Sequence, residues 1–215
     1  MLKIWGRANS INVQKVMWTV GELALPHERI DAGGKFGGLD TDAFRAMNPN
    51  ARVPVISDGG SVVWESHSIV RYLAAKYGSQ SLWQADPAER SLSDRWMDWT
   101  LADLQPAFIG GVFWSLWRTP EPQRNWAAIR QAVARTGALF QILERQLAGK
   151  SFILGEKLSM GDIAAGAQLY RYFELPIERP RIPNVEGWYE RLKSRRAYRE
   201  HVMLPFDDLK GRVSF

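Results

Sequence analysis

Cysteine is absent from this chain of 215 residues, so the sequence offers no protein thiol. Disulfide bonds, cysteine-based zinc sites and cysteine nucleophiles are therefore excluded. Histidine is scarce as well: His27, His67 and His201 are too dispersed to predict a metal site, and we expect them to have surface or packing roles. We accordingly expect a protein that uses no metal.

Long apolar segments are also missing. No stretch approaches the ~18 uninterrupted apolar residues that a membrane-spanning helix needs. The first ten residues, MLKIWGRANS, lack the apolar centre of a signal peptide. From these two absences we expect a cytoplasmic protein with no membrane partner.

Charge of one sign is not concentrated in a block. The chain has 28 Lys and Arg against 23 Asp and Glu, which gives a net charge of +5. The most basic segment, ERLKSRRAYRE (190–200), is bracketed by glutamates, which favours a solvated helix face over a nucleic-acid-binding patch. We expect no nucleic-acid partner, although the mild positive charge favours small anionic substrates.

The first third of the chain alternates strand and helix signals. Short apolar runs predict strands, apolar residues at helical spacing predict helices, and glycines mark the loop at 32–42. Asp58-Gly59-Gly60 is a turn signal between two extended runs, which predicts a β-hairpin. The expected order is β-α-β-α-β-β-α, with strands at 2–5, 27–31, 53–57 and 61–66 and helices at 13–20, 43–47 and 69–77.

The rest of the chain shows almost no strand pattern. A polar, turn-rich segment at 79–87 is followed by two apolar patterns of helical period, one over 92–108 and one over 126–147. Strand-and-helix units followed by a run of helices imply two domains. We expect an α/β domain at 1–78, a linker at 79–87 and an all-α domain at 88–215.

The segment LSMGDIAAG (158–166) predicts a helix start. Ser159 stands at the N-cap with Asp162 three residues later, and Leu158 and Ile163 take the positions of a hydrophobic staple. We expect this segment to serve folding.

Two short segments of the first domain are candidates for ligand binding. In RVPVI, Pro54 lies at a strand entrance, where it marks either an edge position or a cis peptide bond that turns the backbone towards a ligand. In WESHS, Glu65 and Ser66 open a helix whose N–H groups can bind an anion while the carboxylate binds an amine. This suits a ligand with an amino-acid end; simple capping by Ser66 is the alternative.

These segments together resemble the cytosolic glutathione transferases. The likeness covers essentially the whole chain and rests on NPNARVPVI (48–56), ESHSIVRYLAAKYG (65–78) and SMGD (159–162). It implies a thioredoxin-like first domain, an all-α second domain and a homodimer. It also implies that Pro54 is cis and that six residues bind glutathione: Lys35, Arg52, Val53, Pro54, Glu65 and Ser66.

Each of these residues has an implied part of the ligand. The backbone of Val53 would pair with the cysteinyl part of glutathione, and Glu65 with Ser66 would hold the γ-glutamyl end. Arg52 stands where related enzymes carry Gln or Lys. Lys35, in the glycine-rich loop, is the candidate for the glycyl carboxylate.

Families of this type use Tyr, Ser or Cys to contact the sulfur. The chain lacks Cys, its first tyrosine is Tyr72, and Ser10 is the hydroxyl at the first strand–helix turn, which resembles the serine-type theta, phi and nu classes. A hydroxyl hydrogen bond would stabilise the thiolate of a thiol whose pKa is ordinarily about 8.5. Ser10 and Asn12 are therefore the catalytic candidates, although Ser10 could merely cap the helix.

The second substrate is expected to bind to aromatic residues of the helical domain, namely Phe108, Phe113, Trp114 and Trp117. An apolar pocket suits a hydrophobic electrophile, although an aromatic stripe at helical spacing also suits a core. The leading hypothesis is a glutathione transferase. The alternatives are a glutathione-dependent disulfide or peroxide reductase without a protein cysteine, and a transferase-like binding module without turnover.

Overall fold

The structure, a computed structural model, describes residues 1–79 and 81–213. Gln80, Ser214 and Phe215, which the predicted linker and helical domain include, lie outside the described residues. The chain forms two compact units. Among the described residues, the first contains 1–79, 81–83 and Arg196–Leu204, and the second contains Gln84–Arg195 and 205–213.

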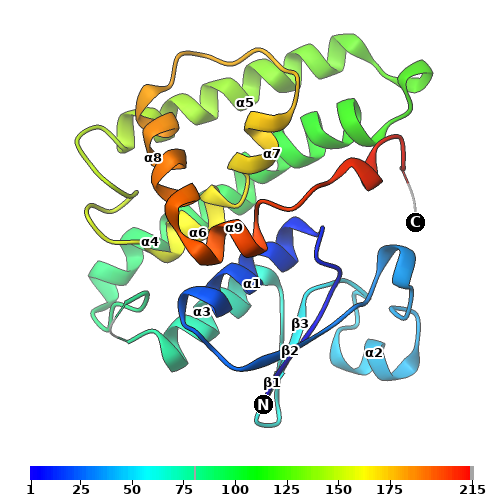
Figure 1. The fold of residues 1–215 in the computed structure, drawn as a ribbon, viewed down its shortest axis with the longest axis vertical. Coiled ribbons are helices and arrows are strands. Elements are labelled where there is room, and N and C mark those ends of the chain that lie inside the picture. Colours follow the sequence, from blue (N-terminus) through cyan, green and yellow to red (C-terminus); the bar gives the residue numbers. More distant parts are fainter. Residues whose placement is uncertain (80, 214–215) are drawn as a thin grey trace. The chain divides into compact units, whose positions relative to one another are not determined.

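A mixed four-stranded sheet organises the first unit. The strands are β1 (Leu2–Trp5), β2 (His27–Ile30), β3 (Val55–Asp58) and β4 (Ser61–Trp64), and their order in the sheet is β2-β1-β3-β4 (Figure 1). Strand β1 pairs in parallel with β2 and antiparallel with β3, and the predicted hairpin joins β3 to β4. The parallel pair requires a crossover, which the first helix supplies.

Helices cover both faces of this sheet. They are α1 (Ile11–Glu22), α2 (Asp42–Met47) and α3 (Ser66–Tyr77). On one face, apolar residues of α1 and α3, such as Val16 and Leu73, form a core with Ile4 and Ile56 of the strands. On the other face, Phe44 of α2 packs against the sheet. The predicted βαβαββα order and thioredoxin-like fold are confirmed.

A short C-terminal helix, α9 (Arg196–His201), belongs to the first unit. The sequence-based boundaries placed this segment in the helical domain. It packs on α1, where the rings of Trp18 and Tyr198 meet edge to face with centroids 4.8 Å apart. Gly21 allows this approach, because a Cβ atom there would lie 2.8 Å from Cβ of Ala197. Such long-range packing leaves no local sequence signal.

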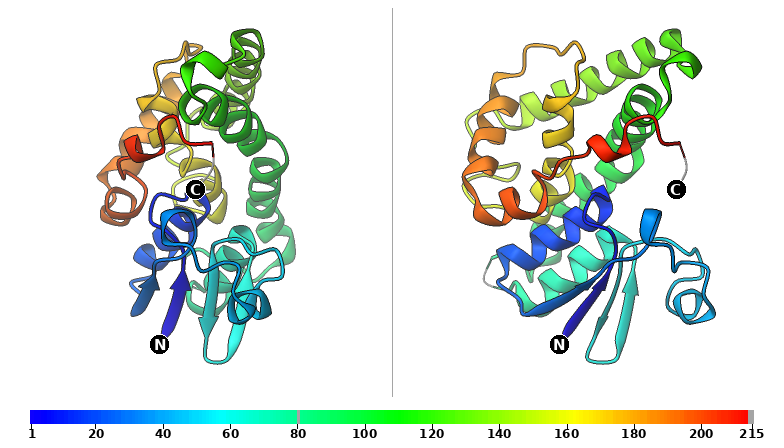
Figure 2. Two further views of the ribbon diagram at one scale, coloured as in Figure 1. Left: turned by 90° about the vertical axis from the view of Figure 1, so that its right-hand side faces the viewer. Right: turned by 45° about the vertical axis from the view of Figure 1, so that its right-hand side comes forward.

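The second unit contains helices (Figure 2). A continuous helical stretch begins with α4 (Pro87–Trp99) and goes on through the π-helical segments Thr100–Leu104 and Pro106–Arg118. The further helices are α5 (Trp126–Gln146), α6 (Met160–Gly166), α7 (Leu169–Glu174) and α8 (Pro183–Ser194). The two long helices predicted from the sequence are confirmed. None of the described helices combines the length and apolar character needed to cross a membrane.

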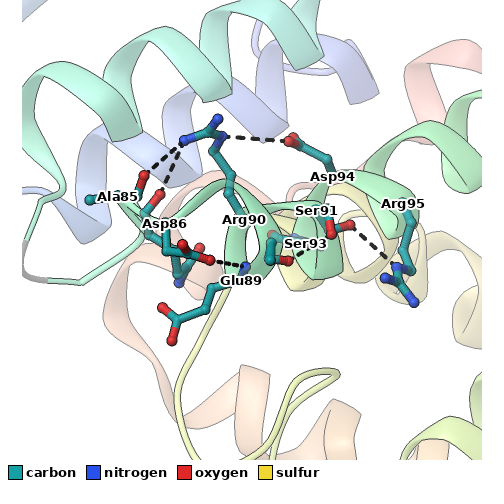
Figure 3. A network of polar contacts seen from close by, with 11 residues as sticks. Ala85, Asp86, Glu89, Arg90, Ser91, Ser93, Asp94 and Arg95 are labelled. Carbon is teal, nitrogen blue, oxygen red and sulfur yellow. Dashed lines mark hydrogen bonds and ion pairs between the residues drawn. The ribbon is translucent and has the colours of Figure 1, made fainter.

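Local polar contacts fix the start of α4 (Figure 3). Asp86 is the N-cap and accepts a hydrogen bond of 2.9 Å from the backbone N–H of Glu89. Arg90 reaches back to the carbonyl oxygen of Ala85 and lies 3.9 Å from the carboxylate of Asp94. Pro87 begins the helix, where its missing N–H costs no hydrogen bond.

The predicted capping box at the start of α6 is confirmed. Ser159 and Asp162 satisfy one another's backbone N–H groups, and the Asp162 carboxylate also accepts from the backbone N–H of Ile153 at 2.8 Å. Asp162 is fully buried, and burial raises its pKa to about 6 against the opposing effect of these hydrogen bonds. The segment is structural, as expected.

Candidate active site

The turn between β1 and α1 brings two segments of the first unit close together. A Cβ atom on Gly6, directly after β1, would lie 2.4 Å from a methyl carbon of Val13 and 3.3 Å from Cβ of Val53. Glycine therefore allows the first turn of α1 to approach the Val53-Pro54 segment. This close approach places Ser10, at the start of α1, in the same region as the predicted glutathione-binding backbone.

Ser10 stands at the N-cap of α1 with an extended backbone (φ −82°, ψ 123°). Ser10 thus occupies the cap position, but its side chain makes no capping hydrogen bond to the helix. The residue is 9% exposed. The hydroxyl therefore lies at the positive end of a 12-residue helix without serving that helix as an acceptor.

The peptide bond between Val53 and Pro54 is cis, as the resemblance implied. Pro54 is buried and precedes β3, while Arg52 is exposed. The side-chain amide of Asn48 donates a hydrogen bond of 2.8 Å to the carbonyl oxygen of Arg52 and so holds this segment.

The start of α3 carries the second predicted subsite. Glu65 is the N-cap, with φ of 67°, and Ser66 is the first residue of the helix. Ser66 therefore does not cap this helix, because Glu65 occupies the N-cap position. A non-glycine residue with positive φ costs free energy, and such residues cluster at functional sites. Ser66 is buried and Glu65 is exposed, so the carboxylate is accessible to a ligand.

A buried lysine joins the two helix starts. Lys15 Nζ lies 3.2 Å from Asn12 Oδ1 and 2.9 Å from His67 Nε2. Complete burial lowers the pKa of Lys15 to about 7, and the nearby carboxylate of Glu65 acts in the opposite direction. The sequence analysis did not single out Lys15. The available signal was a lysine among the apolar positions of the first helix, three residues after Asn12.

Two family models match this chain. The model of the glutathione S-transferase N-terminal domain matches residues 9–76, and the model of the C-terminal domain matches residues 127–191. Glutathione S-transferase GstB of Escherichia coli K12 is 43% identical over 208 residues, which cover 95% of this chain and 99% of that protein. The chain belongs to the glutathione transferase family.

Solved structures of other glutathione transferases are also similar to this chain. The theta class glutathione S-transferase from Xanthomonas axonopodis pv. citri, with glutathione bound, has a TM-score of 0.90 at 46% identity and covers 95% of this chain and 98% of its own. The glutathione transferase BmGSTD1 from Bombyx mori is 22% identical with a TM-score of 0.86, covers 97% of this chain and 95% of its own, and supports the fold. The predicted activity, that of a glutathione transferase, is confirmed by the named relatives.

Lys35 lies in the glycine-rich loop of this transferase. It belongs to the short 3₁₀ helix Gly34–Phe36 and is exposed, with its Nζ 5.2 Å from the centre of the Phe36 ring. Its contact with glutathione stays a prediction, as do the contacts of Arg52, Val53, Glu65 and Ser66.

The four aromatic residues predicted for the second substrate differ in exposure. Phe108 and Phe113 are buried in the second unit, where Phe113 packs edge to face against Phe206 with centroids 5.6 Å apart. Trp114 is 39% exposed, and the indole N–H of Trp117 donates a hydrogen bond of 3.2 Å to the carbonyl oxygen of Phe206. Trp114 is thus the most accessible of the four, and the assignment of all four to a substrate pocket stays a prediction.

The second unit also contains a pocket of about 620 Å³ along α5 and the segment 176–180. None of the four predicted aromatic residues lines it; Trp126 and Arg130 do. Within residues 1–79 and 81–213, no group of three or more His, Asp or Glu side chains could hold a metal ion.

Proposed function

We propose that this transferase binds glutathione in its first unit and ionises the thiol with the hydroxyl of Ser10. The thiolate then attacks an electrophilic carbon of a hydrophobic compound and displaces its leaving group. The observation that carries the proposal is the position of Ser10, whose hydroxyl lies at the N-terminal end of α1 and makes no capping hydrogen bond.

The physical basis is control of the thiol pKa. A thiol with a pKa of about 8.5 is mostly protonated at neutral pH, whereas the thiolate is the nucleophile. An O–H group that donates to sulfur favours the charged form, and the positive end of a helix adds to this effect. One pKa unit corresponds to about 1.4 kcal/mol, so one charge-assisted hydrogen bond together with a helix dipole suffices for a useful shift.

The remaining contacts with glutathione follow from the chemistry of the ligand. The exposed carboxylate of Glu65 suits the γ-glutamyl ammonium, and Ser66 with the N–H groups at the start of α3 suits its carboxylate. The backbone of Val53 would pair with the cysteinyl part, and Arg52 and Lys35 are cations suited to the glycyl end. The glutathione bound to the Xanthomonas transferase supports glutathione as the ligand.

The second substrate is a hydrophobic electrophile, for which Phe108, Phe113, Trp114 and Trp117 are the candidate contacts. By analogy with the family, we also assign to the chain a homodimeric state, a cytoplasmic location and a role in detoxification. Sedimentation of the purified protein tests the first of these, because a dimer and a 24.5 kDa monomer separate well.

The direct test combines binding with two activity assays. Calorimetry is expected to show glutathione binding to the wild type, and Glu65→Gln is expected to weaken it about tenfold, because a charge-assisted hydrogen bond is lost. Glu28→Gln is the matched control, since Glu28 is an exposed residue of β2 outside the proposed site. Absence of binding in the wild type would overturn the proposal.

The activity assays compare conjugation of glutathione to an aryl halide with reduction of a small mixed disulfide. In the second reaction, the glutathione thiolate attacks one sulfur of the disulfide, releases the other as a thiolate and forms a mixed disulfide with the first. A second glutathione thiolate then attacks the glutathione sulfur of this mixed disulfide, which releases the remaining thiolate and gives glutathione disulfide. Conjugation faster than reduction supports the transferase. Reduction without conjugation would instead assign the site to the reductase chemistry.

A further inference from the structure

The pocket along α5 has no part in the proposed reaction. Of the residues that the structure describes, none that we assign to glutathione or to the second substrate lines it. Its α5 residues recur every three or four positions from Trp126 to Gln141, so they form one stripe along the helix. The segment 176–180, which follows α7 and runs beside α5, forms the facing wall (Figure 1). We call this feature the α5 pocket.

The α5 pocket has the dimensions of a single hydrocarbon chain. The stripe from Trp126 to Gln141 is about 22 Å long, because a helix rises about 1.5 Å per residue. A volume of about 620 Å³ over that length leaves a mean cross-section of roughly 28 Å². This is too narrow for a helix, whose diameter is about 10 Å. It suits one extended alkyl chain, since the chains of one bilayer leaflet are about 15 Å long.

Arg179 holds the wall of the α5 pocket that faces α5. Its guanidinium donates through Nη2 to the carbonyl oxygens of Tyr172 and Phe173, at 2.9 and 2.8 Å. Gly137 lets this wall approach the helix, because a Cβ atom there would lie 3.2 Å from Cδ of Pro180. The pocket is therefore formed before a ligand binds, which lowers the entropic cost of binding.

Three charged side chains line the α5 pocket, namely those of Arg130, Glu178 and Arg179. Within the described part of the chain, Arg130 and Glu178 make no hydrogen bond or ion pair, and Nη1 of Arg179 donates to no protein acceptor. The two cations thus outnumber the one carboxylate. Arg130 lies one turn after Trp126, at the N-terminal end of α5, where the helix dipole also favours negative charge. An anionic group is therefore favoured at this end of the pocket.

We propose that the α5 pocket binds a long-chain carboxylate. The carboxylate pairs with Arg130, and the alkyl chain runs along the apolar stripe past Val133 towards Gln141. An arginine without a protein partner supplies two donors in the geometry of a carboxylate, and the apolar walls remove the chain from water. This ligand is neither glutathione nor the electrophile, so the inference does not rest on the proposed function.

Calorimetry with octanoate, decanoate and dodecanoate, each below the concentration at which it forms micelles, tests the ligand class. Each addition of two CH₂ groups should tighten binding about tenfold, because both groups are buried. Dodecyltrimethylammonium has the same chain with a cationic head, and it should bind at least about fivefold more weakly than dodecanoate. Affinity that is independent of chain length would contradict the proposal, and so would equal affinity for the two heads.

Two charge variants locate the carboxylate. Arg130→Gln should weaken dodecanoate binding about fivefold, because a charge-assisted pair is lost. Glu178→Gln should tighten it, because a like charge is removed from the lining. Both residues are exposed, so neither change is expected to disturb the fold. Unchanged affinity in Arg130→Gln would contradict the proposal.

A variant that fills the α5 pocket distinguishes the other possible occupants. Ala134→Trp should weaken dodecanoate binding at least tenfold, because Ala134 is an exposed residue of the stripe. Ala127→Trp is the matched control, at an exposed residue of α5 outside the lining, and should bind as the wild type does.

The same variant should keep the oligomeric state of the wild type in sedimentation and its rate of aryl halide conjugation. A change of oligomeric state would assign the pocket to a second copy of the chain, and a loss of conjugation would assign it to the second substrate. Either result would overturn the proposal.

Discussion

Trp188 of α8 donates its indole N–H to Asp162 of α6 across 3.1 Å, and both residues are fully buried. The same carboxylate accepts from the backbone N–H groups of Ile153 and Ser159, each at 2.8 Å. One carboxylate thus joins a helix start, a preceding loop and a second helix of the helical unit.

Removal of this carboxylate should be among the most destabilising single changes in the second unit. Asp162→Ala leaves several buried donors without their acceptor, and each such loss costs about 1–3 kcal/mol. We expect the free energy of unfolding to fall by about 3 kcal/mol or more, measured by urea denaturation. Glu121→Ala, at a residue exposed in the same unit, should change it by less than about 0.5 kcal/mol. A loss as small as that of Glu121→Ala would contradict the structural role of Asp162.

Burial of Lys15 predicts a pH-dependent stability. Burial lowers the pKa of Lys15 from its ordinary value of 10.5 to about 7 in the folded protein. Between these two pH values the unfolded chain therefore binds a proton at Lys15 that the folded protein does not. The contribution of Lys15 to the free energy of unfolding therefore rises with pH from about 7 upwards, with a limiting slope of about 1.4 kcal/mol per pH unit.

Lys15→Met removes this dependence. The variant should have a higher free energy of unfolding than wild type near neutral pH, and this difference should shrink as the pH rises. Urea denaturation at several pH values measures the difference. A difference independent of pH would show that Lys15 keeps its ordinary pKa.

Gly6 is predicted to be essential for the shape of the glutathione subsite. Gly6→Ala would place a methyl group 2.4 Å from Val13, and the neighbours can relieve this only by moving the start of α1 or the Val53 segment. We expect the free energy of unfolding to fall by about 1–3 kcal/mol, as overpacking usually costs. Glutathione affinity measured by calorimetry should fall as well. The control is Gly110→Ala in the helical segment Pro106–Arg118, where the backbone is not left-handed and an added Cβ meets nothing within 4 Å. If Gly6→Ala binds glutathione as tightly as Gly110→Ala does, the close approach does not shape the subsite.

The sequence predicted those features that local patterns determine. Helical spacing located α1 and α5, Asp58-Gly59-Gly60 located the hairpin, and Ser159 with Asp162 located the start of α6. Each of these signals lies within a few residues of chain, so no tertiary information was needed.

Long-range packing accounts for what the sequence did not reveal. The attachment of α9 to α1 depends on the contact between Trp18 and Tyr198, which are far apart in the sequence. Likewise, Lys15 and His67 are 52 residues apart and meet only because α1 and α3 pack on the same face of the sheet. His67 was expected to have a surface or packing role, and the structure places it in a buried hydrogen bond with Lys15.

The central claim is that the Ser10 hydroxyl ionises glutathione, and the pKa of the bound thiol measures this most directly. Ser10→Ala should raise that pKa by about 1–2 units and lower kcat/KM at neutral pH about 10- to 100-fold, while glutathione affinity changes little. Ser61→Ala, at an exposed residue of β4, is the control and should match the wild type. A bound thiol in Ser10→Ala that titrates at the wild-type pKa would contradict the account.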